Sequence, residues 1–174
     1  MQELKYLAGY PTSVTRQVVQ LIAENRLGSL LAGKYPEAHA IRSEKALYDF
    51  TVATKNKYLS TSAPLSKVVF DGKINVIHQA LGTHTFVSRV QGSKLKAKHE
   101  IRIAVIFKDA PLAFLKMIVV HELAHLKEKE HNKAFYKLCE HMEPNYHQLE
   151  FDVRLFLTHL DVSGPLYHER ENRE

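Results

Sequence analysis

The chain has 174 residues, 45% hydrophobic and 25% charged, which is ordinary for a soluble globular protein with a sizeable core. Its one cysteine, Cys139, excludes an internal disulfide and a cysteine cage for zinc, and the net charge of +5 is too small to indicate nucleic-acid binding by itself. Because neither a secretory signal nor a run of ~18 apolar residues is present, we expect a cytoplasmic protein without a membrane partner.

The first third of the chain predicts two helices. One starts at Pro11, carries apolar positions at helical spacing from Val14 to Ile22, and ends at Tyr35-Pro36. The second covers about residues 43–58. We expect both to form a structural layer and not a site.

After residue 62 the pattern changes to short β-rich runs. Asp71-Gly72 stands between two such runs and is typical of a hairpin, and further strands are expected at 83–90 and 100–107. Hairpins pair neighbouring strands in opposite directions, so we expect a small antiparallel sheet.

The remaining chain predicts helices. A long helix is expected at 108–130, with Asp109 as its N-cap, followed by helices at about 132–142 and 146–160. The fold class is therefore α+β. We expect one domain over 1–174, with a helical part at 1–62, a core at 63–160 and a polar tail at 161–174.

The stretch "VVHELAHLKEKEH" places polar side chains in the apolar part of the long helix. His121 and His125 are four residues apart, so their imidazoles project from the same face and can reach one metal ion. Glu122 would face a water molecule on that ion and accept its proton. Burying these groups without a metal or hydrogen-bond partner would cost roughly several kcal/mol. The alternative is two core histidines that bond backbone carbonyls.

Catalytic zinc takes three protein ligands, and His131 is our choice for the third. On a continuous helix it would point away from His125, so the helix must end before it and the chain must turn back. Glu150, His141 and His147 remain as competing ligands.

These residues resemble the YgjP-like metallopeptidase-domain family, a group of compact zincins related to the WLM and SprT-like groups. The resemblance covers at least 87–160, and its matching residues are His121, Glu122, His125, His131, Phe135, Met142, Pro144 and Tyr146. It implies a zincin-like fold with a zinc ion held by the three histidines and with Glu122 as general base. The histidine spacing is also that of metzincins, but Glu128 stands where they have glycine. The Trp-Gly-Ser-Cys element of many relatives is reduced here to Gly92-Ser93.

Two hydrolytic reactions follow from the site. A metallopeptidase would cleave a peptide or protein paired with the strand at 100–107. The resemblance also implies a UTP pyrophosphatase using the same metal site, with a nucleotide as substrate. A basic stretch before the metal helix suits a triphosphate, and it consists of Arg89, Lys94, Lys96, Lys98 and Arg102. The alternative for this stretch is a solvated hairpin.

Other roles stay open. Arg89 or Tyr136 would stabilise a developing negative charge. Asp152 or Glu150 would orient a ligand histidine, and the alternative for either is an ion pair with Arg154 or a lysine. A DNA-associated protease module is a third reading, but the sequence has no zinc ribbon or helix-turn-helix signature. Divalent ions other than zinc would also suit histidine ligands.

Overall fold

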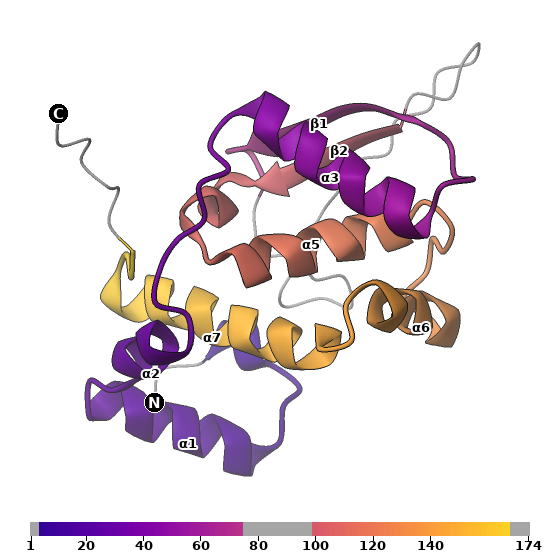
Figure 1. Cartoon of the computed structure of the whole chain (residues 1–174). Helices are drawn as coiled ribbons and strands as arrows, with labels where there is room; N and C mark the ends of the chain where they lie inside the picture. Colours follow the sequence, from indigo (N-terminus) through magenta and orange to yellow (C-terminus); the bar gives the residue numbers. More distant parts are fainter. Residues whose placement is uncertain (1–3, 75–98, 168–174) are drawn as a thin grey trace, which may run out of the picture.

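The computed structural model describes residues 4–74 and 99–167 (Figure 1). Its elements in chain order are η1 (Lys5–Leu7), α1 (Thr12–Ala23), α2 (Leu27–Lys34), α3 (Glu44–Tyr58), β1 (Leu65–Asp71), β2 (His99–Ala104), η2 (Val105–Asp109), α5 (Leu112–Ala124), α6 (Lys133–Met142) and α7 (Tyr146–Ser163). The described residues thus mix helices with a small sheet.

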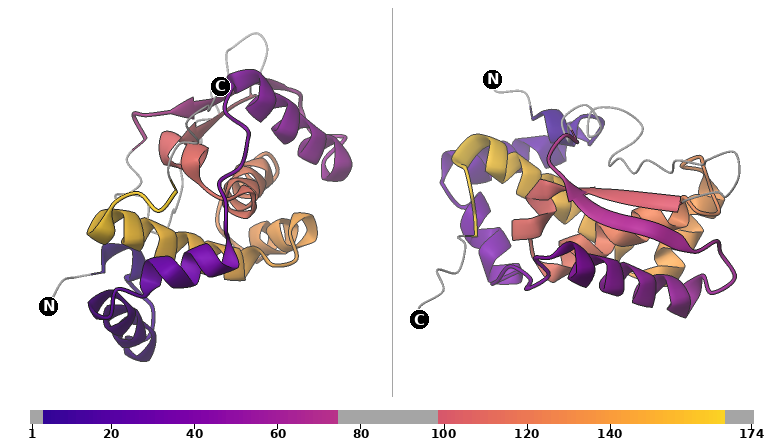
Figure 2. Two further views of the ribbon diagram at one scale, coloured as in Figure 1. Left: turned by 60° about the vertical axis from the view of Figure 1, so that its left-hand side comes forward. Right: turned by 90° about the horizontal axis from the view of Figure 1, so that it is seen from above.

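Helix α5 is the centre of the fold. It lies between the strand pair with α3 on one side and α7 on the other, and α6 follows its C-terminal end (Figures 1 and 2). Ten of its 13 residues are buried, and its C-terminal half from Met117 to Ala124 is buried at every position. Polar side chains in this half of α5 are therefore enclosed by neighbouring elements.

The two described strands run parallel. β1 pairs with β2 in register from Lys67 opposite Glu100 to Asp71 opposite Ala104 (Figure 2). The predicted antiparallel sheet is therefore not confirmed, because β1 does not pair through a tight hairpin with β2. The 27 residues at 72–98 between them are long enough for the crossover that a parallel pair requires.

Two other strand predictions have different outcomes. The predicted strand at 83–90 and the second arm of the Asp71-Gly72 hairpin from residue 75 lie outside the described residues. The strand predicted at 100–107 ends at Ala104, where the backbone enters η2.

The first predicted helix is in fact two helices, α1 and α2. They are separated at Asn25, whose φ of 55° lies in the left-handed region that asparagine tolerates better than most residues. The amide of Arg26 then donates to the carbonyl of Leu21 at 2.8 Å, which closes α1. Helical spacing alone did not reveal this break.

The helices predicted at about 43–58, 132–142 and 146–160 are present as α3, α6 and α7, but the long helix predicted at 108–130 is shorter, because α5 covers only Leu112–Ala124. Ser43 caps α3 by accepting a hydrogen bond from the Ala46 amide at 3.1 Å. Asp109 does not cap α5, which begins after Pro111; its carboxylate pairs with Arg42 instead. In the described ranges, no helix combines the length and apolar character required to cross a membrane.

Candidate metal centre

The C-terminal end of α5 carries two histidines on one face. His121 lies in the last full turn and is 1% exposed, whereas His125 is the half-buried residue that ends the helix. Their ring centroids are 5.0 Å apart. The four-residue spacing therefore produces the predicted pair of neighbouring imidazoles.

A turn after α5 brings the third histidine back to this pair. The amides of Lys127 and Glu128 both donate to the carbonyl of Ala124, at 3.1 and 2.9 Å, and this closes the helix. Asn132 then starts α6, its side chain accepting from the Phe135 amide at 2.9 Å. As a result the ring of His131 lies 5.0 Å from that of His121 and 4.8 Å from that of His125. The prediction that the helix ends before His131 is confirmed.

The donor atoms of the three histidines converge. One ring nitrogen from each lies within 4.8 Å of the others. The Nε2 atoms of His121 and His131 are 3.1 Å apart. Two nitrogens bound tetrahedrally to one zinc ion at about 2.0–2.1 Å lie roughly 3.3 Å from each other. The group therefore fits a divalent metal that accepts imidazole ligands.

Hydrogen bonds orient the two histidines of α5. Nδ1 of His121 lies 2.7 Å from the hydroxyl of Tyr146, the first residue of α7. Nδ1 of His125 lies 3.0 Å from the main-chain oxygen of Glu128. A carbonyl only accepts, so His125 carries its proton on Nδ1 and has a lone pair on Nε2.

Asp152 and Glu150 form the ion pairs that were the alternative to orienting a histidine. The buried carboxylate of Asp152 accepts from Lys34 and Tyr35, both at 2.5 Å, and from Gln148 at 2.9 Å. Glu150 pairs with Arg154 at 3.4 Å. The contact of Tyr146 with His121 was not predicted from the sequence, although Tyr146 is one of the residues that resemble the family motif.

Phe135 forms one wall of the centre. Its ring centroid lies 4.9 Å from that of His121 and 4.7 Å from those of His125 and His131, and the side chain is fully buried. The ring therefore excludes water from one side of the imidazoles, which strengthens electrostatic interactions there.

Glu122 follows His121 on α5 and is 0% exposed. It is not a member of the histidine group whose ligand atoms converge among the described residues. Glu122 and His121 are consecutive residues near the C-terminal end of α5. A buried carboxylate beside a metal group is a common arrangement for a general base.

The hydroxyl of Tyr146 is also connected to Cys139. The two side chains share a hydrogen bond, and both are fully buried. Burial raises the pKa of the Cys139 thiol to about 12 and raises that of the Tyr146 hydroxyl far above its ordinary value. Both groups therefore keep their protons at neutral pH.

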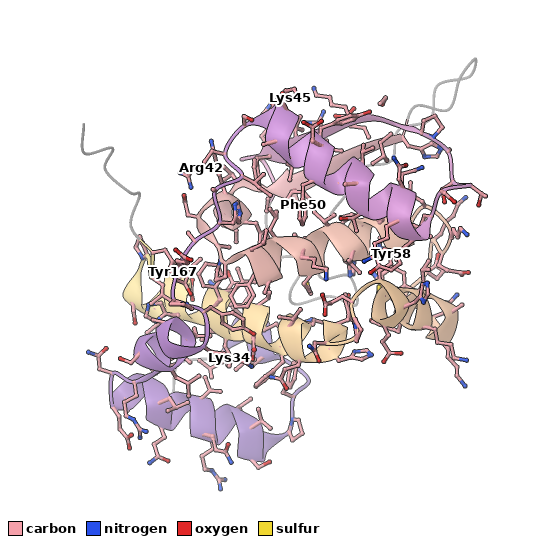
Figure 3. The ribbon with its side chains drawn as sticks, viewed as in Figure 1. Lys34, Arg42, Lys45, Phe50, Tyr58 and Tyr167 are labelled. Atoms are coloured by element: carbon pink, nitrogen blue, oxygen red, sulfur yellow. The ribbon has the colours of Figure 1, made fainter. Side chains whose placement is uncertain are left out.

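The competing third ligands lie against other partners. His141 packs edge-on against Tyr58, with centroids 5.5 Å apart, and Figure 3 shows Tyr58 at the end of α3 near α6. His147 pairs with Glu140 at 3.0 Å. Tyr136, expected to stabilise negative charge, has its ring 6.4 Å from that of His131.

The basic stretch is described only in part. Arg102 lies on β2, where its guanidinium pairs with Asp71 at 3.1 Å and Glu100 at 2.6 Å. The pair with Asp71 links β2 to β1, whereas Glu100 lies on β2 itself. The remaining members lie outside the described residues, and they are Arg89, Lys94, Lys96 and Lys98.

Comparisons with known proteins agree with this centre. The model of the YgjP-like, metallopeptidase domain family matches residues 73–153, a range that includes all three histidines and Tyr146. A UTP pyrophosphatase of Escherichia coli (strain K12) is 60% identical over 162 residues, which cover 93% of this chain and 97% of the relative. No solved structure matches the chain.

Proposed function

Since the chain belongs to the YgjP-like metallopeptidase-domain family, we propose that it is a zincin-like hydrolase in which His121, His125 and His131 hold one divalent cation. The observation that carries this proposal is the convergence of three imidazole nitrogens within 4.8 Å. Zinc is the proposed cation, because three histidine ligands with one open coordination position are a common arrangement in catalytic zinc sites. Nickel, cobalt and manganese also accept such ligands.

Glu122 is proposed as the general base. A zinc ion held by the three histidines would lower the pKa of its bound water to about 7 and would polarise the bond that is attacked. The buried carboxylate of Glu122 takes the proton from this water. Phe135 keeps bulk water away from the imidazole side of the reaction.

A nucleoside triphosphate, with UTP first, is the proposed substrate. Support comes from the relative named UTP pyrophosphatase, which aligns with 93% of the chain. Water adds its oxygen to the α-phosphorus, the bond from that phosphorus to the bridging oxygen breaks, and pyrophosphate leaves with a nucleoside monophosphate as the second product. The sequence has no GxxxxGK[ST] motif for triphosphates, so the reaction is assigned to the histidine centre.

The basic stretch would hold the triphosphate in this reaction. Its members, Arg89, Lys94, Lys96, Lys98 and Arg102, stay predictions from the sequence. For Arg102 the ion pairs with Asp71 and Glu100 favour a structural role instead.

Peptide hydrolysis is the second candidate, and the description of the family as a metallopeptidase domain favours it. In this reaction Glu122 takes a proton from water and passes it to the leaving amine as the peptide bond breaks. Both candidates use the same histidines and the same base, so only the substrate separates them.

The test compares purified wild-type protein with Glu122→Gln and Glu150→Gln. Each is measured for bound metal and offered nucleoside triphosphates and a denatured protein. We expect wild type to release pyrophosphate from UTP, Glu122→Gln to keep the metal but lose about 10²–10⁴-fold in kcat, and Glu150→Gln to resemble wild type. Glu150→Gln is the matched control, because it makes the same change in a half-buried carboxylate paired with Arg154.

The outcomes separate the candidates. Cleavage of the denatured protein without pyrophosphate release would replace the first candidate by the second. Activity on neither substrate would refute both, and equal losses in the two variants would refute the assignment of Glu122.

A further inference from the structure

We infer that Tyr146 is a positioning residue for the metal centre: its hydroxyl accepts the Nδ1 proton of His121 and thereby keeps Nε2 of that ring available for the metal. The inference rests on the proposed metal site, but it concerns a side chain outside the ligand set and the general base. The positioning is assigned to a single oxygen atom, which one substitution removes.

The contact is short and enclosed. Nδ1 of His121 and the hydroxyl oxygen of Tyr146 are 2.7 Å apart, and the two side chains are 1% and 0% exposed. The ring planes are within 17° of parallel, with centroids 6.4 Å apart. Because both groups are shielded from solvent, water does not replace this hydrogen bond cheaply.

The neighbours on both sides determine the direction of the hydrogen bond. Nε2 of His121 faces Nε2 of His131 at 3.1 Å, so Nε2 is the nitrogen that points to the shared metal position. A metal-bound nitrogen must offer its lone pair, and the ring proton then resides on Nδ1. Tyr146 therefore accepts from His121 and has its own proton left to donate, and the sulfur of Cys139 is its partner.

The backbone holds the Tyr146 hydroxyl in place. Tyr146 is the first residue of α7, and its amide donates to the carbonyl of Glu143 at 2.9 Å in the turn before the helix. Helix α7 packs along α5, so the start of one helix faces the end of the other (Figures 1 and 2). A fixed acceptor of this kind sets both the tautomer and the rotation of a ligand histidine.

The two α5 histidines are oriented by different means. His125 donates to a main-chain oxygen, that of Glu128 at 3.0 Å, which no side-chain substitution removes. His121 depends on a side-chain hydroxyl. Tyr146→Phe deletes this oxygen and retains the buried ring, so the change isolates positioning from packing.

The test measures metal affinity in Tyr146→Phe and in a control, Tyr167→Phe. The hydroxyl of Tyr167 donates to the carbonyl of Tyr35 at 2.6 Å, and Figure 3 shows this residue on the opposite side of the molecule from α6. Tyr146→Phe loses the hydrogen bonds with His121 and Cys139, and Tyr167→Phe loses the one with Tyr35, so only Tyr146→Phe removes a bond to a histidine of the centre. The zinc Kd is determined by competition with a chelator of known affinity, and thermal unfolding is recorded on the metal-free proteins.

We expect the zinc Kd of Tyr146→Phe to rise about 10–100-fold and that of Tyr167→Phe to stay at the wild-type value. A Kd for Tyr146→Phe equal to that of wild type would overturn the inference and leave the proposed function intact. A wild-type protein that binds no zinc would overturn the proposed metal site and this inference together.

A second measurement uses only the wild type and so decides the question if Tyr146→Phe does not fold. Nitrogen-15 NMR of the zinc-loaded protein reports which nitrogen of His121 carries the proton. We expect a protonated Nδ1 and a zinc-bound Nε2. Zinc on Nδ1 would overturn the inference, because the Tyr146 hydroxyl would then have no proton to accept.

Discussion

Replacing His131 by alanine tests the proposed ligand that lies outside helix α5. The residue lies half-buried in the turn between α5 and α6, outside both helices. The variant should therefore fold, with the free energy of unfolding of the metal-free protein within roughly 1 kcal/mol of wild type. The main loss is expected in metal affinity.

The size of this loss follows from the number of ligands. Four-ligand structural zinc sites bind with about 10–16 kcal/mol, or roughly 3–4 kcal/mol for each ligand. At about 1.4 kcal/mol for each tenfold change, the loss of one histidine from a group of three raises the zinc Kd by about 10²–10³-fold.

The same change is visible in thermal unfolding. At free zinc 100 times the wild-type Kd, binding stabilises wild type by about 2.7 kcal/mol. A variant with a 100-fold higher Kd keeps only about 0.4 kcal/mol under these conditions. The difference of about 2.3 kcal/mol corresponds to a Tm roughly 5–9 °C lower for a chain of this size.

His141→Ala and His147→Ala are the matched controls. Both remove an exposed imidazole from the neighbouring chain, where the structure gives it another partner. We expect both to bind zinc as wild type does. A wild-type zinc Kd in His131→Ala together with a raised zinc Kd in either control would refute the choice of the third ligand.

Three further predictions concern stability and substrate. Asn132→Ala removes the cap of α6 and should cost about 1 kcal/mol, seen as a Tm about 2–4 °C lower, whereas an unchanged Tm would mean that the cap is not formed. Burial lowers the pKa of His39 and of His159 in the folded protein, so the unfolded chain takes up more protons than the folded one as the pH falls through the ordinary histidine range. The Tm of the metal-free protein should therefore decrease as the pH is lowered, and an increase would contradict this reasoning. Changing the three lysines within residues 94–98 to alanine should raise KM for the nucleotide but leave peptide cleavage unchanged, and equal losses in both assays would argue against a triphosphate contact.

Local geometry made part of the centre predictable. The pairing of His121 with His125 follows from helical spacing, and the return of His131 follows from the requirement that the helix must stop before it. Both inferences span ten residues or fewer of chain. The position of α3 was also predicted to within one or two residues from local spacing.

Contacts between distant segments could not be inferred in this way. Tyr146 reaches His121 only because α7 packs along α5, and nothing in the residues around Tyr146 specifies that packing. Asp152 was a candidate from the sequence for orienting a ligand histidine, but its carboxylate pairs with Lys34 on α2. The direction of β1 relative to β2 likewise depends on the path of 27 intervening residues and not on the alternation within either strand.

His125 is held by a main-chain oxygen, so its orientation depends on the number of residues in the following turn and not on which residues these are. Glu128 supplies only its carbonyl to the imidazole, and its amide closes the preceding helix, so most side chains at this position would serve equally well. Adding or deleting one residue between His125 and His131 would move that oxygen and the third imidazole together. Substitutions within this turn should therefore be tolerated, provided that its length is kept.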